Sequence, residues 1–325
     1  MESRPGDPVV WALLDDRAGN RSQCLGVVEA LGHGHEALEL RYGPLANLPN
    51  AILGATFLGL ATRSRMGLAP PWPAIVIAAG RRTAPVVRRI KRLAGDQVFA
   101  VQIMDPGSGR DEFDLIAVPR HDGPVDGSAL MTITGAPHPL TQTVLDEANA
   151  VWAPRLAELP TPRITVVVGG STRRRPFTAA MARELGIAVN RMANDTGGSL
   201  MVTTSRRTDA AAESALVRSL TAPAQVHRWG DVGDNPYRGF LALADVVVVT
   251  GDSVSMCSEA CAGSGPVYIF APPGFVTDKH ARLHQELYAR GLARPLSGDA
   301  VELWSHAPLN AAAEIAAEIR RRLGA

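Results

Sequence analysis

The sequence predicts an α/β protein with two Rossmann-like domains facing each other across a cleft, and a C-terminal helix that returns to the first domain. The chain has 325 residues and 46% hydrophobic content, enough material for two cores. Apolar runs of strand length alternate with segments of helix length, a pattern typical of parallel sheets covered on both faces. This alternation restarts near the middle of the chain. We therefore expect domains at residues 1–157 and 158–306, and a bracing helix at 307–325.

The first domain begins the alternation. Its expected strands are residues 9–14, 36–40, 74–79, 98–104 and 113–118. Its expected helices are residues 19–31, 51–61, 81–93 and 141–156. The last helix runs into ELPTPR, where two prolines within three residues indicate a short, stiff linker.

The second domain repeats the pattern after this linker. Its expected strands are residues 164–170, 200–205, 225–229, 245–251 and 266–270. The final segment, PLNAAAEIAAEIRRRLGA, is rich in helix formers and carries arginines in its last turn, where they complement the helix dipole. It predicts the returning helix.

Composition excludes several functions. With 33 Lys and Arg against 32 Asp and Glu, the chain has no overall field that would attract nucleic acid, so any anion must be bound locally. The three cysteines lack the paired spacing of zinc sites, and the start lacks an apolar signal core. The sequence contains no serine-hydrolase motif and no HExxH motif. We expect a cytoplasmic protein without a metal ion.

The longest apolar run, AILGATFLGLA at residues 51–61, is too short to span a bilayer. Arg63 and Arg65 follow it. Two interpretations stay open: a helix that faces the core, or a helix that lies on an anionic membrane surface, at the inner face of the membrane.

The strongest motif is DVVVVTGDSVSMCSEACAGSGPVYIF, which predicts a complete βαβ unit. Its turn and first helical turn offer small residues and amides that suit a phosphate, and Glu259 follows as an acceptor for ribose hydroxyls. The alternative is a simple helix cap with a solvated glutamate. The predicted binding residues are Thr250, Gly251, Asp252, Ser253, Val254, Ser255, Met256 and Glu259.

Two further loops follow predicted strands of the second domain. Gly169, Gly170 and Ser171 let a backbone approach a ligand closely, although the pattern is neither GxGxxG nor a P-loop, and a plain turn is the alternative. Arg206 follows another strand, and its Arg-Arg-Thr sequence repeats one in the first domain that contains Arg81 and Arg82. Arginines at the carboxyl ends of strands favour anions, with surface charge as the alternative.

The first strand ends in two aspartates before a turn into a helix. Asp16, Gly19, Asn20 and Gln23 are expected at the mouth of the first sheet, unless they serve only as cap and turn residues. His121 stands with Asp122 after another strand. A neighbouring histidine and aspartate suit acid–base work, although loop histidines are often structural.

These motifs together resemble the ELM-type mitochondrial fission protein family, in the order DDRAGNRSQ, AGRRTAP, VPRHD, VGGSTR, TTSRRT, NPYRGFLALAD and TGDSVSMCSEA. The resemblance covers nearly the whole chain. It implies either a bacterial member or a plant type tied to mitochondrial division through a dynamin-related partner, and the composition suits a bacterial member.

Two of these loops are also similar to the nucleotide-sugar loops of the peptidoglycan lipid II N-acetylglucosaminyltransferase. That resemblance implies the GT-B architecture, with Gly169, Gly170 and Ser171 near a diphosphate and Glu259 on the ribose. The expected function is glycosyl transfer from a nucleoside diphosphate sugar to an unknown acceptor, with no tightly bound cofactor and no metal dependence. Asp16 or His121 is the expected base. The alternative is a non-catalytic adaptor that recruits a protein partner at a membrane.

Overall fold

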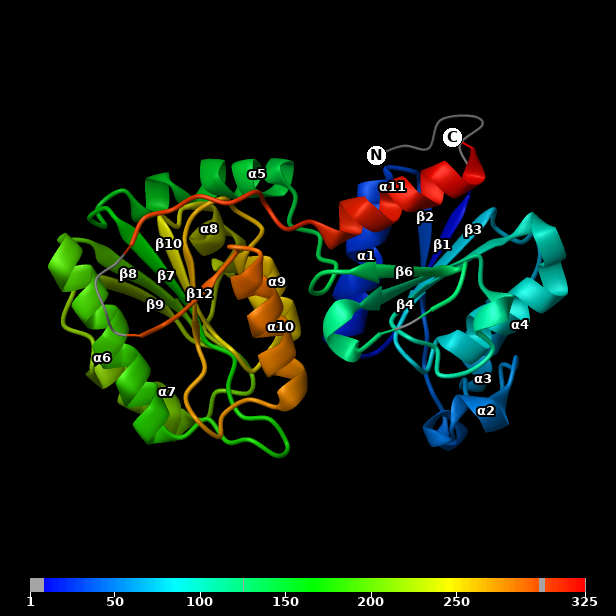
Figure 1. Ribbon diagram of the computed structural model, residues 1–325, viewed down its shortest axis with the longest axis horizontal. Coiled ribbons are helices and arrows are strands. Elements are labelled where there is room, and N and C mark those ends of the chain that lie inside the picture. The colour runs from blue at the N-terminus through cyan, green and yellow to red at the C-terminus, as the bar shows by residue number, and fades with distance from the viewer. Residues whose placement is uncertain (1–8, 125, 298–301, 325) are drawn as a thin grey trace. The chain divides into compact units, whose positions relative to one another are not determined.

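The computed structural model describes residues 9–124, 126–297 and 302–324, which form two compact units (Figure 1). Unit 1 comprises the chain up to Pro139 together with the segment from Asn310 onward, and unit 2 runs from Leu140 to Leu309. Each unit contains a six-stranded sheet in which all strands are parallel. The chain therefore folds as two α/β units, as the sequence predicts.

The sheet of unit 1 has the order β2-β1-β3-β4-β5-β6. Its strands are β1 (Val10–Leu14), β2 (His35–Glu39), β3 (Ile75–Ala79), β4 (Phe99–Ile103), β5 (Leu115–Pro119) and β6 (Leu130–Ile133). Its helices are α1 (Ala18–Leu31), α2 (Asn50–Leu53), α3 (Thr62–Met66), α4 (Ala84–Ala94) and α11 (Ala311–Leu323), with short 3-10 turns at η1 (Pro44–Asn47), η2 (Gly95–Gln97), η3 (Arg110–Glu112) and η4 (Arg120–Asp122). Unit 1 has two hydrophobic clusters. Helices α1 and α11 pack in one of them, and α4 packs in the other.

The sheet of unit 2 has the order β12-β11-β10-β7-β8-β9. Its strands are β7 (Arg163–Val167), β8 (Ser199–Thr203), β9 (Ala224–His227), β10 (Val246–Thr250), β11 (Val267–Phe270) and β12 (Arg294–Pro295). Its helices are α5 (Gln142–Trp152), η5 (Pro154–Leu156), α6 (Ala179–Thr196), α7 (Ala210–Arg218), α8 (Tyr237–Ala242), α9 (Val254–Ala260) and α10 (Asp278–Ala289). The apolar runs of β7, β8 and β10 are buried along almost their whole length, as central strands of a two-sided sheet require.

Strand order reverses once in each sheet. In unit 1 the chain places β2 on one side of β1 and then β3 on the other side. In unit 2 it places β8 and β9 on one side of β7 and then β10 on the other. Ligands of open α/β sheets bind outside the carboxyl ends of the strands at such a reversal. The residues that follow β1 and β3, and those that follow β7 and β10, are therefore the first places to look for a site.

The boundary between the units differs from the prediction. The first domain was expected to end at residue 157, but α5 belongs to unit 2 because Leu140 and Leu145 are buried in the same cluster as Leu241 of α8. The segment ELPTPR consequently lies inside unit 2 and does not link the units. The returning helix is present as α11, whose apolar residues lie in the core of unit 1.

The single helix expected at residues 51–61 is also wrong. Helix α2 stops at Gly54, whose φ of 56° is a left-handed conformation that a glycine adopts readily, and α3 begins only at Thr62. The apolar run is thus divided between buried Leu53 and Leu60 and exposed Ile52 and Leu58. Among the residues that the structure describes, no helix combines the length and apolar character needed to cross a membrane.

Candidate functional site

At the reversal in the second sheet, two backbone N–H groups donate hydrogen bonds to side chains of the neighbouring loop. The N–H of Gly169 donates to Thr250 Oγ1 at 2.7 Å, and the N–H of Gly170 donates to Asp252 Oδ2 at 3.0 Å. A Cβ on Gly169 would lie 2.3 Å from that carboxylate oxygen, so only glycine fits. The loop after β7 is therefore fixed directly to the loop after β10.

The loop after β8 joins the same cluster through Arg207. Its Nη1 lies 2.6 Å from Asp252 Oδ2, and its backbone oxygen accepts from the N–H of Ser171 at 2.9 Å. Thr208 Oγ1 donates to the oxygen of Gly169 at 2.7 Å, and Ser205 Oγ donates to it as well. We call Gly169, Gly170, Arg207, Thr250 and Asp252 the switch-point cluster.

The charges of this cluster suit an anion. The Asp252 side chain is fully buried, whereas 31% of the Arg207 side chain remains exposed. The carboxylate thus holds the guanidinium in place, while part of the Arg207 side chain stays exposed. Arg173, Arg174 and Arg206 in the same loops are exposed as well. The expected ligand-holding arginine was Arg206, but Arg207 is the one tied to the cluster.

The two glycines play a different part from the one expected. Their N–H groups are already used by Thr250 and Asp252, so these amides do not point at a phosphate. Ser171 accepts from the N–H of Phe177 through Oγ at 3.0 Å. The glycine pair allows two loops to pack closely. The groups available to bind an anion are the exposed arginines around it.

His284, which the sequence analysis did not select, contacts the loop that carries Thr250 and Asp252. His284 of α10 donates from Nε2 to the oxygen of Gly251 at 3.0 Å, and Cys257 Sγ lies 4.0 Å from the same nitrogen. Burial lowers the pKa of His284 to about 4, so its ring is neutral at physiological pH. His284 is distant from Gly251 in the sequence, so no local motif connects the two residues.

Helix α9 begins where the expected phosphate turn ends. Ser253 Oγ accepts from the N–H of Met256 at 3.3 Å, which makes this serine the helix cap. Val254, Ser255 and Met256 are partly buried, and Gly251 packs against the ring of His284. The motif thus forms the turn and helix that were predicted.

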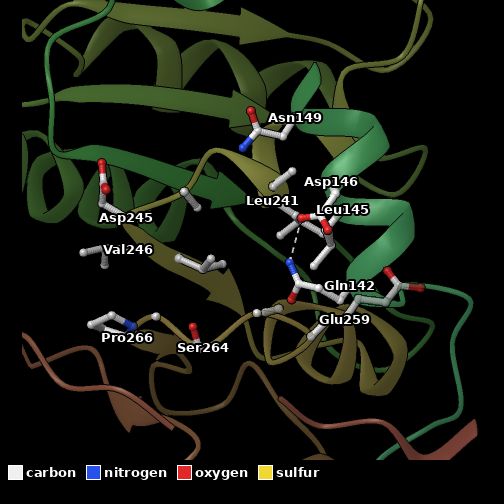
Figure 2. A pocket seen from close by; sticks show the side chains of 17 residues that line it. Gln142, Leu145, Asp146, Asn149, Leu241, Asp245, Val246, Glu259, Ser264 and Pro266 are labelled. Carbon is white, nitrogen blue, oxygen red and sulfur yellow. Dashed lines mark hydrogen bonds between the residues drawn. The ribbon is translucent and has the colours of Figure 1, made fainter. Parts of the chain in front are cut away.

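Glu259 does not join the switch-point cluster. Its carboxylate accepts from the hydroxyl of Tyr237, and it lines a pocket of about 180 Å³ with Gln142, Asp146 and residues at the amino ends of β10 and β11 (Figure 2). Burial raises the pKa of Glu259, although the hydrogen bond from Tyr237 acts in the opposite direction. A ribose contact at this residue is therefore separated from the carboxyl ends where a diphosphate is expected.

The reversal in the first sheet carries a second charged cluster. Arg82, which follows β3, donates to the carboxylates of both Asp15 and Asp16, and its Cζ lies 4.2 Å from the centre of the Tyr42 ring. Asn20 Nδ2 donates to Asp15 Oδ2 at 2.7 Å. Burial alone would raise the pKa of Asp16, but the hydrogen bonds and charge of Arg82 bring it below its usual value. A strong general base at Asp16 is therefore not supported.

The other residues expected in unit 1 lie apart from this pair. Arg81 donates to the backbone oxygens of Leu48 and Ala46 at 2.7 and 2.9 Å and so braces a loop instead of facing a ligand. His121 is 2% exposed and Gln23 is 8% exposed, whereas Gly19 lies on the surface of α1. The ring of His121 is therefore not exposed to solvent in this structure.

Metal ligands are not grouped in the part of the chain that the structure describes, where no set of three or more His, Cys, Asp or Glu residues is arranged to hold an ion. The three cysteines are buried free thiols whose pKa values burial raises.

Solved structures share this architecture. MurG from Acinetobacter baumannii is 16% identical, with 97% of this chain and 90% of that chain covered and a TM-score of 0.50. The UDP-GlcNAc 2-epimerase from Neisseria meningitidis, solved with UDP-GlcNAc bound, is 9% identical, with 97% and 99% covered and a TM-score of 0.55. The two parallel sheets therefore form a GT-B fold.

Sequence comparison identifies the family. The mitochondrial fission protein ELM1 of Arabidopsis thaliana is 34% identical over 301 residues, which cover 85% of this chain and 70% of the relative. The family model described as mitochondrial fission ELM1 matches residues 18–323, which include the returning helix, the whole sheet of unit 2 and every strand of the unit 1 sheet except β1. The chain belongs to the mitochondrial fission ELM1 family.

Proposed function

We propose that this protein binds a nucleoside diphosphate sugar, with the diphosphate at the switch-point cluster of unit 2, and uses it as a glycosyl donor. The observation that carries the proposal is the geometry of Arg207. Buried Asp252 pairs with its guanidinium beside the point where strand order reverses, and part of the Arg207 side chain stays exposed. A guanidinium forms two parallel hydrogen bonds with phosphate oxygens.

The surroundings favour a diphosphate over a single phosphate. Arg173, Arg174 and Arg206 are exposed in the two neighbouring loops, and the only carboxylate within the switch-point cluster is Asp252, which Arg207 neutralises. A ligand with two or more negative charges complements this excess of positive charge. The shared fold with structures that bind UDP-GlcNAc supports a uridine donor as the first to test. Fold alone does not choose between transfer and epimerisation, so the assay must detect both.

Calorimetry with UDP and UDP-GlcNAc tests the site. Arg207→Gln removes the charged hydrogen bonds but keeps a polar side chain, and we expect an affinity about ten- to a hundredfold lower. Arg183→Gln changes an exposed arginine of α6 in the same unit and is the matched control, expected to bind as the unchanged protein does. No binding by the unchanged protein, or equal affinity for Arg207→Gln, would refute the proposed site.

A second candidate function has one observation in its favour. Burial would raise the pKa of Asp16, but Arg82 brings it below its usual value, and His121 is buried; both features weigh against proton transfer by the expected bases of unit 1. This arrangement favours an adaptor that keeps the nucleotide site without turnover. Incubation with UDP-GlcNAc separates the two: release of UDP or formation of an epimer supports an enzyme, and tight binding with neither product supports the adaptor.

A further inference from the structure

The connection between β2 and β3 in unit 1 exposes an unusual amount of apolar surface. Between residues 44 and 66 it contains η1, α2 and α3 (Figure 1). Ile52 is 69% exposed, Leu58 is 52% exposed and Met66 is 78% exposed, and Leu45 and Leu48 are exposed as well. Solvent-facing loops are ordinarily polar, so a concentration of this kind marks a contact surface. We call residues 44–66 the apolar loop.

The apolar loop is held firmly, so its exposed side chains are not a consequence of a loose chain. Tyr42 pairs with Leu60 in an antiparallel bridge, and the N–H of Gly43 donates to the oxygen of Gly59 at 2.9 Å. Near the start of the loop, Arg81 donates to the backbone oxygens of Ala46 and Leu48. Arg65 Nη2 donates to the oxygen of Leu58 at 2.9 Å. With Leu60 buried beneath, this framework leaves Ile52, Leu58 and Met66 facing solvent.

The charge of this region has one sign. From residue 40 to residue 95 the chain contains no aspartate or glutamate, while Arg41 precedes the apolar loop and Arg63 and Arg65 lie in its last helix, α3. Arg41 and Arg63 line a groove of about 410 Å³ together with Ser64 and Glu39. Glu39 offsets part of this charge through Arg21 at 3.0 Å and Arg41 at 3.6 Å, but Arg63 has no acidic neighbour in sequence.

We infer that the apolar loop docks on the surface of a membrane that contains anionic lipids. Ile52, Leu58 and Met66 enter the headgroup and acyl boundary, and Arg41 and Arg63 contact lipid phosphates. Apolar side chains flanked by arginines that outnumber the one acid of the groove, Glu39, complement a negatively charged bilayer surface. A second copy of this chain would bring the same arginines together, so the charges favour lipid over self-association. This inference goes beyond the proposed function and does not depend on it.

Vesicle flotation of the full chain tests the inference. We expect binding to phosphatidylcholine vesicles that contain phosphatidylglycerol, weaker binding to pure phosphatidylcholine, and a fall in binding as salt is raised. The double variant Ile52→Ser with Met66→Ser should lower the partition coefficient at least tenfold, because both inserted side chains are lost. Arg63→Glu should lower it on anionic vesicles only.

The matched controls lie in unit 2. Ile187→Ser changes an apolar side chain that is 49% exposed, and Arg183→Glu changes an exposed arginine of α6; neither should alter vesicle binding. Equal flotation of the double variant and the unchanged protein, or no flotation on anionic vesicles, overturns the inference. Sedimentation velocity without lipid gives the remaining outcome: a dimer that the double variant dissociates would show that a second copy covers the apolar loop. Folding of each variant is checked by its far-UV circular dichroism.

Discussion

At the scale of single residues, Asp252 has two tasks that compete for one carboxylate. Its Oδ2 atom accepts from the N–H of Gly170 and pairs with Arg207, and the side chain is fully buried. A buried carboxylate is costly unless such partners compensate it. The sequence predicted that Asp252 would lie at a ligand loop. It gave no basis for choosing Arg207 over Arg206, because neighbouring residues on a loop point in directions that only the folded backbone decides.

The neutral ring of His284 makes unit 2 sensitive to acid. Its pKa of about 4 in the folded state lies below the ordinary value of 6.5, so the unfolded chain binds a proton that the folded one does not. The free energy of unfolding should therefore fall as the pH drops from 6.5 to about 4, by up to about 3 kcal/mol from this group. Urea titrations across this range should show a shallower pH slope for His284→Gln than for the unchanged protein. His35→Gln, on exposed β2, is the control, and identical slopes for all three proteins would contradict the assignment.

At the scale of elements, the strands and their loops were predicted far better than the helix boundaries. The runs that became β1, β3, β7, β8 and β10 are continuous apolar segments that only a two-sided sheet can bury. The apolar run at residues 51–61 failed as a helix because Gly54 ends α2, and tertiary contacts then hold the remainder in an irregular loop. Strand β12 has two residues, too few to leave a pattern in the sequence.

The turn after β7 depends on a glycine conformation that no other residue reproduces cheaply. Gly170 has a φ of 134°, and a Cβ there would lie 2.2 Å from the oxygen of Arg207. Gly170→Ala should lower the free energy of unfolding by about 3 kcal/mol through strain and the displaced loop. Gly197→Ala, at the end of α6 with φ of 66° and open space around it, should cost only about 1 kcal/mol. Chemical denaturation measures both, and equal losses would show that the contact with Arg207 has little weight.

At the scale of the whole molecule, the chain builds two parallel sheets that differ in strand order but share one feature. In each sheet, a charged pair lies where the strand order reverses: Asp15 with Arg82 in unit 1, and Asp252 with Arg207 in unit 2. The sequence predicted two domains and the motifs at both reversals. It placed the boundary at residue 157 because prolines are a visible signal, whereas the burial of Leu140 and Leu145 beside α8 depends on contacts distant in sequence.

The returning helix α11 connects the two ends of the chain, because it completes the core of unit 1 from the C-terminal end. Ile315 and Ile319 are fully buried in the cluster that contains β1 and β3, and Arg320 Nη2 donates to the oxygens of Ala30 and Leu31 at the end of α1, at 2.9 Å each. Ile315→Ala should lower the stability of unit 1 by about 2 to 5 kcal/mol.

Since the two units have separate cores, the effect should stay local. Hydrogen exchange of Ile315→Ala should accelerate in β1, β3 and α1 and remain unchanged in β7, β8 and β10. Leu323→Ala, at the exposed end of the same helix, should leave exchange in both units as it is. If Ile315→Ala instead accelerates exchange equally in both sheets, the two units unfold as one cooperative body and the expectation of a local effect is wrong.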